Sequence, residues 1–235
     1  MSTRPGSRAR TDSRVVQARS WLGSGIVKAL CRIASMIVCG MLLQPLPPSW
    51  GQSPAPLTAR EVVKSGTMEV GLATGFWQAV TFIGSAQSAD RSAVFVLPRI
   101  GMVVTEEIQA NLWSGNVELL VEPLYARFTQ PFAAEAAGGS LLVKYNLLSF
   151  GRWMPFWDAG AGMLWTNLAP RIPEQSTPFN FVLETGPGVH YFLTRTMTVS
   201  VGVRYHHISN GDIGQRNTGL NAVLPYAGVS WFLPR

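Results

Sequence analysis

One pattern recurs eight times along this chain and limits what it can fold into. Apolar side chains alternate with small or polar ones for about ten residues, and a cluster of turn-forming residues follows. Side chains of an extended strand point alternately to the two faces of a sheet, so a period of two predicts β-strands. No apolar run is long enough to cross a bilayer as a helix. The predicted strands span residues 67–80, 93–104, 115–128, 139–148, 154–165, 178–191, 196–209 and 220–232.

The two faces of the predicted strands differ in polarity. In the seventh strand, Val199, Val201 and Val203 share one phase, whereas Ser200 and Arg204 share the other. Charges of both signs gather in the less apolar phase, where they can pair in a polar lumen but would be costly in a dry core. We therefore predict an all-β fold, an eight-stranded antiparallel transmembrane β-barrel of the outer-membrane type. The charged residues of this phase are Glu69, Arg99, Glu118, Glu122, Lys144, Asp158, Glu184 and Arg204.

Tryptophan residues also favour a membrane barrel. Six of them lie toward the ends of predicted strands, where such a barrel carries an interfacial aromatic girdle. The alternative is a soluble, lipocalin-like barrel with an apolar interior, which would have to keep all the charges out of its core. The six residues are Trp77, Trp113, Trp153, Trp157, Trp165 and Trp231.

The lengths of the connections predict how the barrel is oriented. With both termini on the periplasmic side, the connections after odd-numbered strands face outward, and each has about ten residues, as outer loops do. The connections 149–153 and 192–195 are tight, although 105–114 is not. The predicted outer loops are 81–92, 129–138, 166–177 and 210–219.

The N-terminal segment differs from the rest of the chain. Residues 1–51 hold seven of the 19 Lys and Arg residues but one of the 13 Asp and Glu residues, so the remainder carries no net charge. The formal charge of +6 therefore gives no reason to predict nucleic-acid binding. A basic region, a short apolar run at 33–43 and several prolines predict a signal peptide over 1–51. After this segment we predict a loose periplasmic lead-in over residues 52–66 and the barrel over residues 67–235.

Both cysteines, Cys31 and Cys39, lie in this N-terminal segment. The exported chain would therefore contain no cysteine, which avoids mispairing in an oxidising periplasm. Val38 is bulky where a lipoprotein signal needs a small residue before the cysteine, so a lipid anchor on Cys39 is the weaker alternative.

Three polar residues stand out at the end of the seventh strand and the start of the eighth. His207 and Ser209 are two residues apart, so their side chains share one face at roughly 6–7 Å along the strand. That separation allows an imidazole to take the proton of a serine hydroxyl. Both are in phase with Tyr205 and so face lipid, and antiparallel pairing can bring Asn221 beside His207. Polar groups on a lipid-facing surface are expensive, which favours a function, although rim residues can also bind headgroups without chemistry.

Three other candidates are predicted to face the lumen. His206, His190 and Glu184 are in the inward phase of their strands. Neither histidine lies at ligand spacing from cysteines or a carboxylate, so no metal site is predicted.

The stretch around these residues carries a motif, Arg204-Tyr205-x-His207-x-Ser209-Asn210, followed by Asn217-x-Gly219-Leu220. It resembles the C-terminal signature of the PagL-type lipid A 3-O-deacylases, also called acyloxyacyl hydrolases. The resemblance implies an eight-stranded outer-membrane barrel whose active site faces the outer leaflet. It also implies a serine esterase that acts on the 3-O-acyl ester of lipid A or lipopolysaccharide among outer-membrane lipids, without a cofactor.

The resemblance also implies roles for individual residues. Ser209 would be the nucleophile and His207 the general base. The side-chain amide of Asn210 would stabilise the oxyanion, with the backbone N–H of Gly211 as a second donor. The family's glutamate falls on Asn221, which is a departure from the family pattern.

This departure leaves the third catalytic role open. An amide oxygen at Asn221 can accept the Nδ1–H of His207 and fix its tautomer, but it supplies no negative charge. Asp212, from the following loop, is an alternative acid that is out of strand phase.

Two rivals to an esterase follow. One is a catalytically weak or inactive barrel that binds lipopolysaccharide, and the other is a structural or channel barrel. The sequence does not determine whether the protein forms a homodimer. It also does not determine which acyl-chain length or which ester position of lipid A the protein would prefer.

Overall fold

The structure is a computed structural model of the 235-residue chain and describes residues 58–81 and 90–235. The predicted signal peptide, and the lead-in before Thr58, lie outside the described residues. No helix in the described part is long and apolar enough to cross a membrane.

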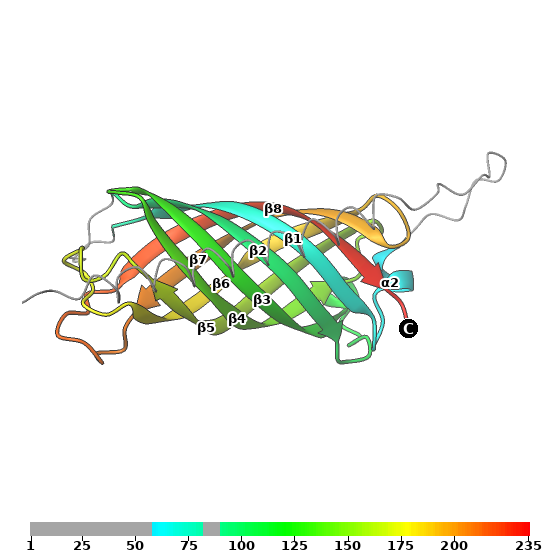
Figure 1. The fold of residues 1–235 in the computed structure, drawn as a ribbon. Helices are drawn as coiled ribbons and strands as arrows, with labels where there is room; N and C mark the ends of the chain where they lie inside the picture. The colour runs from blue at the N-terminus through cyan, green and yellow to red at the C-terminus, as the bar shows by residue number, and fades with distance from the viewer. Residues whose placement is uncertain (1–57, 82–89) are drawn as a thin grey trace, which may run out of the picture. The chain divides into compact units, whose positions relative to one another are not determined.

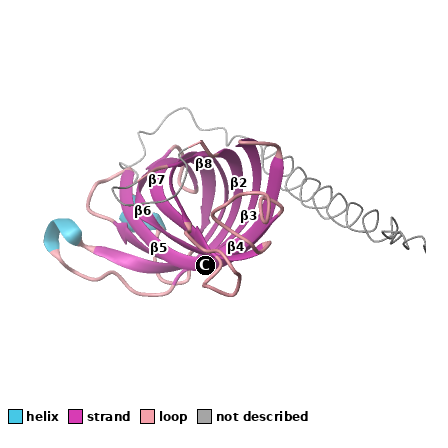
Figure 2. Cartoon of the chain, turned by 90° about the vertical axis from the view of Figure 1, so that its left-hand side faces the viewer, coloured by secondary structure: helices cyan, strands magenta, loops and turns pink. Residues whose placement is uncertain are grey.

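Eight strands form a closed antiparallel barrel in which each strand pairs with the next and the last pairs with the first (Figures 1 and 2). Closure leaves no strand edge with unpaired backbone groups, as a lipid environment requires. The predicted eight-stranded transmembrane barrel is therefore confirmed. The strands are β1 (Met68–Ala79), β2 (Ser92–Val103), β3 (Gly115–Gln130), β4 (Ala134–Leu147), β5 (Trp153–Thr166), β6 (Phe179–Phe192), β7 (Met197–Ser209) and β8 (Leu220–Leu233).

Alternate residues point into the lumen and out toward lipid, in the phase that the sequence predicts. On the outer wall, Ile100, Leu141 and Val201 are all more than half exposed. Inside, Lys144 and Arg204 are fully buried although charged. An apolar outer wall around a lumen that holds charged side chains is the arrangement of a barrel embedded in a bilayer.

The buried charges are paired, as predicted. Arg204 binds three carboxylates, with its guanidinium nitrogens 2.6 Å from Glu122, 2.6 Å from Asp158 and 3.0 Å from Glu184. Glu122 also accepts a hydrogen bond from Arg99 at 2.9 Å. Each charge thus has opposite charges within hydrogen-bonding distance, which offsets the cost of burying it.

A second buried group of charges surrounds Lys144. Its ammonium pairs with Glu69 and lies 2.9 Å from Glu118. Ser230 donates a hydrogen bond of 2.6 Å to Glu69, which ties this group to β8.

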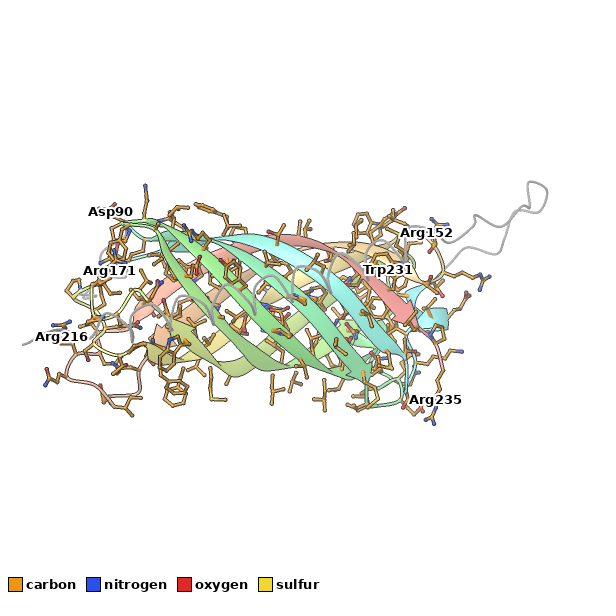
Figure 3. The ribbon with its side chains drawn as sticks, in the orientation of Figure 1. Asp90, Arg152, Arg171, Arg216, Trp231 and Arg235 are labelled. Carbon is orange, nitrogen blue, oxygen red and sulfur yellow. The ribbon has the colours of Figure 1, made fainter. Side chains whose placement is uncertain are left out.

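The two ends of the barrel differ, and we call them the loop end and the terminal end (Figure 3). Inside the loop end lies an apolar cluster that includes Trp77 and Phe128. A smaller cluster fills the terminal end and includes Phe192 and Phe232. In Figure 3, the labelled residues at the loop end are Asp90, Arg171 and Arg216, and those at the terminal end are Arg152, Trp231 and Arg235.

The described part of the lead-in is not loose, which corrects the prediction for these residues. Helix α2 (Ala59–Val62) lies at the terminal end (Figure 1), and its side chains join the apolar cluster there. The Ala59 N–H donates to the Gly151 carbonyl at 2.7 Å, and Asn116 donates to the Val63 carbonyl at 2.9 Å. Burial of these apolar side chains holds the segment in place.

Two other predictions were wrong. Trp77 belongs to the inward phase of β1 and is buried, so it is not part of an interfacial girdle. The outer loop predicted at 129–138 is instead a connection of residues 131–133, because β4 begins at Ala134 and pairs with the end of β3. Gly138 is needed within the sheet, because a Cβ at this position would lie 2.0 Å from the Met163 carbonyl oxygen.

Replacing Arg204 by alanine tests the lumen network. The variant leaves buried carboxylates without their shared guanidinium, and removing one partner of a buried ion pair costs about 3–5 kcal/mol. Arg127→Ala is the matched control, because its ion pair with Glu135 is exposed and such pairs contribute about 0–1 kcal/mol. Urea unfolding in detergent micelles, followed by tryptophan fluorescence, measures the free energy of unfolding. Equal losses in the two variants would contradict a stabilising network.

Candidate active site

The pairing of β7 with its neighbours brings His207 and Asn221 together. The two residues are direct partners in the register between β7 and β8. On the other side of β7, Leu183 is opposite His207 and Phe181 is opposite Ser209. His207, Ser209 and Asn221 are half-buried on the outer wall. This is the face that the phase of the strands predicts.

A hydrogen bond of 2.7 Å joins His207 Nδ1 to the side-chain oxygen of Asn221. The same oxygen accepts a hydrogen bond of 2.5 Å from the Tyr205 hydroxyl. An amide oxygen only accepts hydrogen bonds, so His207 Nδ1 carries the proton. The lone pair of the neutral ring is then on Nε2, which is the nitrogen that can act as a base.

The Nε2 side of the ring points along the barrel toward Gly219. A Cβ added to Gly219 would lie 2.8 Å from His207 Cε1 and 3.4 Å from Nε2. The register pairs residue 207 with 221 and 208 with 220, and Gly219 is the residue just before β8 begins. The imidazole therefore extends from Asn221, which its Nδ1 contacts, toward Gly219, which its Cε1 and Nε2 approach.

Gly219 is fixed by two independent requirements. Its backbone φ of +70° is one that residues other than glycine rarely adopt. In addition, the His207 ring occupies the space that a Cβ at this position would need. The motif suggested this residue, but only the structure shows that it borders the base.

The loop after β7 is organised by Asn210. Its side chain is buried, donates to the Arg216 carbonyl at 2.8 Å and accepts from the Asp212 N–H at 3.1 Å. Its backbone N–H donates to the Asn217 side chain at 3.0 Å. One N–H of the Asn210 amide is thus used by the loop, and its predicted oxyanion role stays a prediction.

Asp212 and Gly211 are held in this loop. The Asp212 carboxylate accepts a hydrogen bond of 3.0 Å from Asn217, and within residues 58–81 and 90–235 it makes no hydrogen bond or ion pair with His207. The histidine's partner is Asn221 instead. Gly211 has a φ of +60° and lies against the Phe181 ring, and no hydrogen bond between described residues engages its N–H.

The lumenal histidines belong to other contacts. His206 Nδ1 accepts a hydrogen bond of 3.1 Å from Trp77, and His190 is 3.0 Å from the Thr198 hydroxyl. Among the described residues, no group of three or more His, Cys, Asp or Glu side chains could hold a metal ion.

A family model described as lipid A 3-O-deacylase (PagL) matches residues 82–230. This match spans more than half of the chain and includes every residue of the candidate site. The chain belongs to the PagL family. Membership in this family indicates an outer-membrane protein.

Comparison with curated proteins finds no match to this sequence. Among solved structures, the outer membrane enzyme PagL is 19% identical, with a TM-score of 0.49 over 68% of this chain and 97% of that one. Neisserial surface protein A is 17% identical, with a TM-score of 0.46 over 70% and 96%. The N-terminal β-barrel domain of OprF from Pseudomonas aeruginosa is 14% identical, with a TM-score of 0.46 over 72% and 99%. Membership in the PagL family rests on the family model and not on these weak structural likenesses.

Replacing Gly219 by alanine should displace the His207 ring. Gly151→Ala is a matched control, because Gly151 has a similar φ of +64° but no atom within 4 Å of an added Cβ. Both variants should lose about 1–2 kcal/mol of stability through backbone strain. Side-chain NMR of ¹⁵N-labelled histidine should show a shifted His207 Nδ1–H signal in Gly219→Ala alone. An unmoved His207 signal in Gly219→Ala would contradict the contact.

Proposed function

We propose that this protein is an outer-membrane serine esterase that removes the ester-linked acyl chain from the 3-position of lipid A. The proposal is supported by membership in the PagL family and, above all, by the hydrogen bond from His207 Nδ1 to Asn221 on the outer wall. That bond leaves the basic nitrogen on the side of the ring that lies near Gly219. The predicted signal peptide over residues 1–51 would supply the export that this location needs.

The reaction follows from the tautomer. Ser209 Oγ attacks the acyl carbonyl carbon while its proton passes to His207 Nε2. The tetrahedral intermediate then expels the sugar oxygen, which takes this proton and leaves as a hydroxyl group. Water, deprotonated by the same nitrogen, attacks the acyl-enzyme, and its proton returns to Ser209 as the fatty acid is released.

The oxyanion of each intermediate needs hydrogen-bond donors close to Ser209. Gly211 offers a backbone N–H two residues after the nucleophile. Asn210 offers the N–H of its amide that is not used by Arg216. We assign both as oxyanion donors, each of which contributes about 10²–10³ in rate at comparable sites.

Asn221 takes the place of a catalytic acid. Its oxygen orients the ring and fixes the tautomer, but it does not supply the negative charge that a carboxylate would bring to the imidazolium. A rate below that of a site with a carboxylate is the expected consequence.

The surroundings of the site suit a lipid substrate. Phe181, Leu183 and Val223 flank the site on the outer wall, and each is 38–55% exposed. These apolar side chains can contact acyl chains that approach sideways through the leaflet. Lipid A is therefore proposed to reach the site from the membrane and not through the lumen, which buried side chains fill.

A second candidate function rests on Asn221 itself. If an amide cannot support turnover, the same surface would bind lipopolysaccharide without cleaving it.

Ser209→Ala should abolish deacylation, because it removes the attacking oxygen. Wild-type barrel reconstituted with purified lipid A should release one 3-O-acyl chain, detected by mass spectrometry. Ser149→Ala, which changes a serine at the terminal end, is the control and should act like the wild type. Intact lipid A with the wild type would refute the esterase and favour the binding protein.

A further inference from the structure

An amide at position 221 creates a requirement that a carboxylate would not. A carboxylate has two equivalent oxygens, whereas an amide has one acceptor and one donor group. His207 Nδ1 keeps its proton only if the oxygen of Asn221 faces the ring. If the NH₂ group faced the ring, the proton would move to Nε2 and the base would be lost, which in serine proteases costs about 10⁴ in rate.

Tyr205 contacts the Asn221 oxygen that faces His207. It lies on the outer face of β7, two residues before His207, and is 38% exposed. Its strand partner is Val223, so its phenol reaches diagonally to Asn221. There the hydroxyl donates to the amide oxygen at 2.5 Å, and the same oxygen accepts from His207 at 2.7 Å.

We propose that Tyr205 is a positioning residue that holds the Asn221 amide with its oxygen toward His207. This inference rests on the proposed esterase function. Rotating the amide would remove the acceptor that the phenol has on Asn221 and place an NH₂ group there instead. A phenol oxygen is a poor acceptor, because its lone pairs are delocalised into the ring, so the rotated amide is disfavoured.

The size of the effect follows from the strength of one hydrogen bond. Such a bond shifts an orientation equilibrium by up to about tenfold. The surrounding apolar side chains lower the local dielectric, which strengthens the bond. The effect should fall on kcat and not on KM, because the amide acts on the base and does not bind the lipid.

The kinetic test compares the same substitution in two backgrounds. Tyr205→Phe should lower kcat about two- to fivefold with KM unchanged, because a tenfold shift leaves a mixture of the two orientations. In the Asn221→Asp background, the same substitution should leave kcat unchanged, because either carboxylate oxygen can face the ring. Asn221→Glu offers the same comparison should the aspartate variant fail to fold. Tyr145→Phe is the matched control, since it removes a phenol hydrogen bond of 2.9 Å to the Trp113 carbonyl.

A second readout does not depend on activity. The chain has three histidines, so ¹⁵N-histidine NMR at alkaline pH can report which ring nitrogen of His207 carries the proton. His207→Asn identifies the signal. The wild type should be protonated at Nδ1, and Tyr205→Phe should show a mixture with the Nε2 form, whereas Tyr145→Phe should not.

These readouts separate the two proposals. An unchanged His207 tautomer in Tyr205→Phe, or equal losses of kcat in the Asn221 and carboxylate backgrounds, would overturn the role of Tyr205. A wild type that leaves lipid A intact would refute the esterase, and the NMR result would then decide the role of Tyr205 alone.

Discussion

The alternation of side chains in a closed sheet is the constraint on which the rest of this structure depends. Every second residue of a strand must face the lumen. Because the sheet is closed, every strand is paired on both sides and its alternation is fixed. Because Arg204 has to be inside to meet its carboxylates, the residues one and three positions later in the other phase have to be outside. Tyr205 and His207 therefore face lipid for the same reason that the ion pairs are buried.

The same constraint supplies precision. A site on neighbouring strands has its backbone fixed by the ladder of hydrogen bonds, which loops lack. The register of β7 and β8 sets His207 opposite Asn221, and Gly219, just before β8, leaves room for the ring. The loop that follows Ser209 is held by the buried Asn210, so the proposed oxyanion donors also lie on an ordered segment. The lipid-facing wall of the barrel thus carries polar groups in a defined arrangement.

The sequence predicted those features that depend on periodicity. The phase of β7 was enough to place His207 outside and His206 inside, and the charges in the inward phase predicted a polar lumen. Two predictions failed at strand ends. Position near a strand end predicts an interfacial Trp77, whereas the phase of β1 places it inside; the predicted loop 129–138 includes the first five residues of β4, which begins at Ala134.

Other features could not be read from the sequence. The contact of Tyr205 with Asn221 depends on the diagonal between two strands and on side-chain torsions, which spacing does not determine. The packing of α2 into the terminal end needs the shape of the lumen, and its four-residue sequence gives no strong helical pattern. Periodicity predicts which face a residue occupies, whereas its partners across the sheet follow only from the register.

In the proposed mechanism, Ser209 and His207 act as a nucleophile and its base on the lipid-facing wall. The most direct measurement is labelling of the bilayer-embedded barrel with a long-chain alkyl phosphonate ester, followed by mass spectrometry of its peptides. A single adduct on Ser209, formed far more slowly in His207→Asn, is the predicted result. An adduct on another residue, or equal labelling of Ser209 with and without the imidazole, would contradict it.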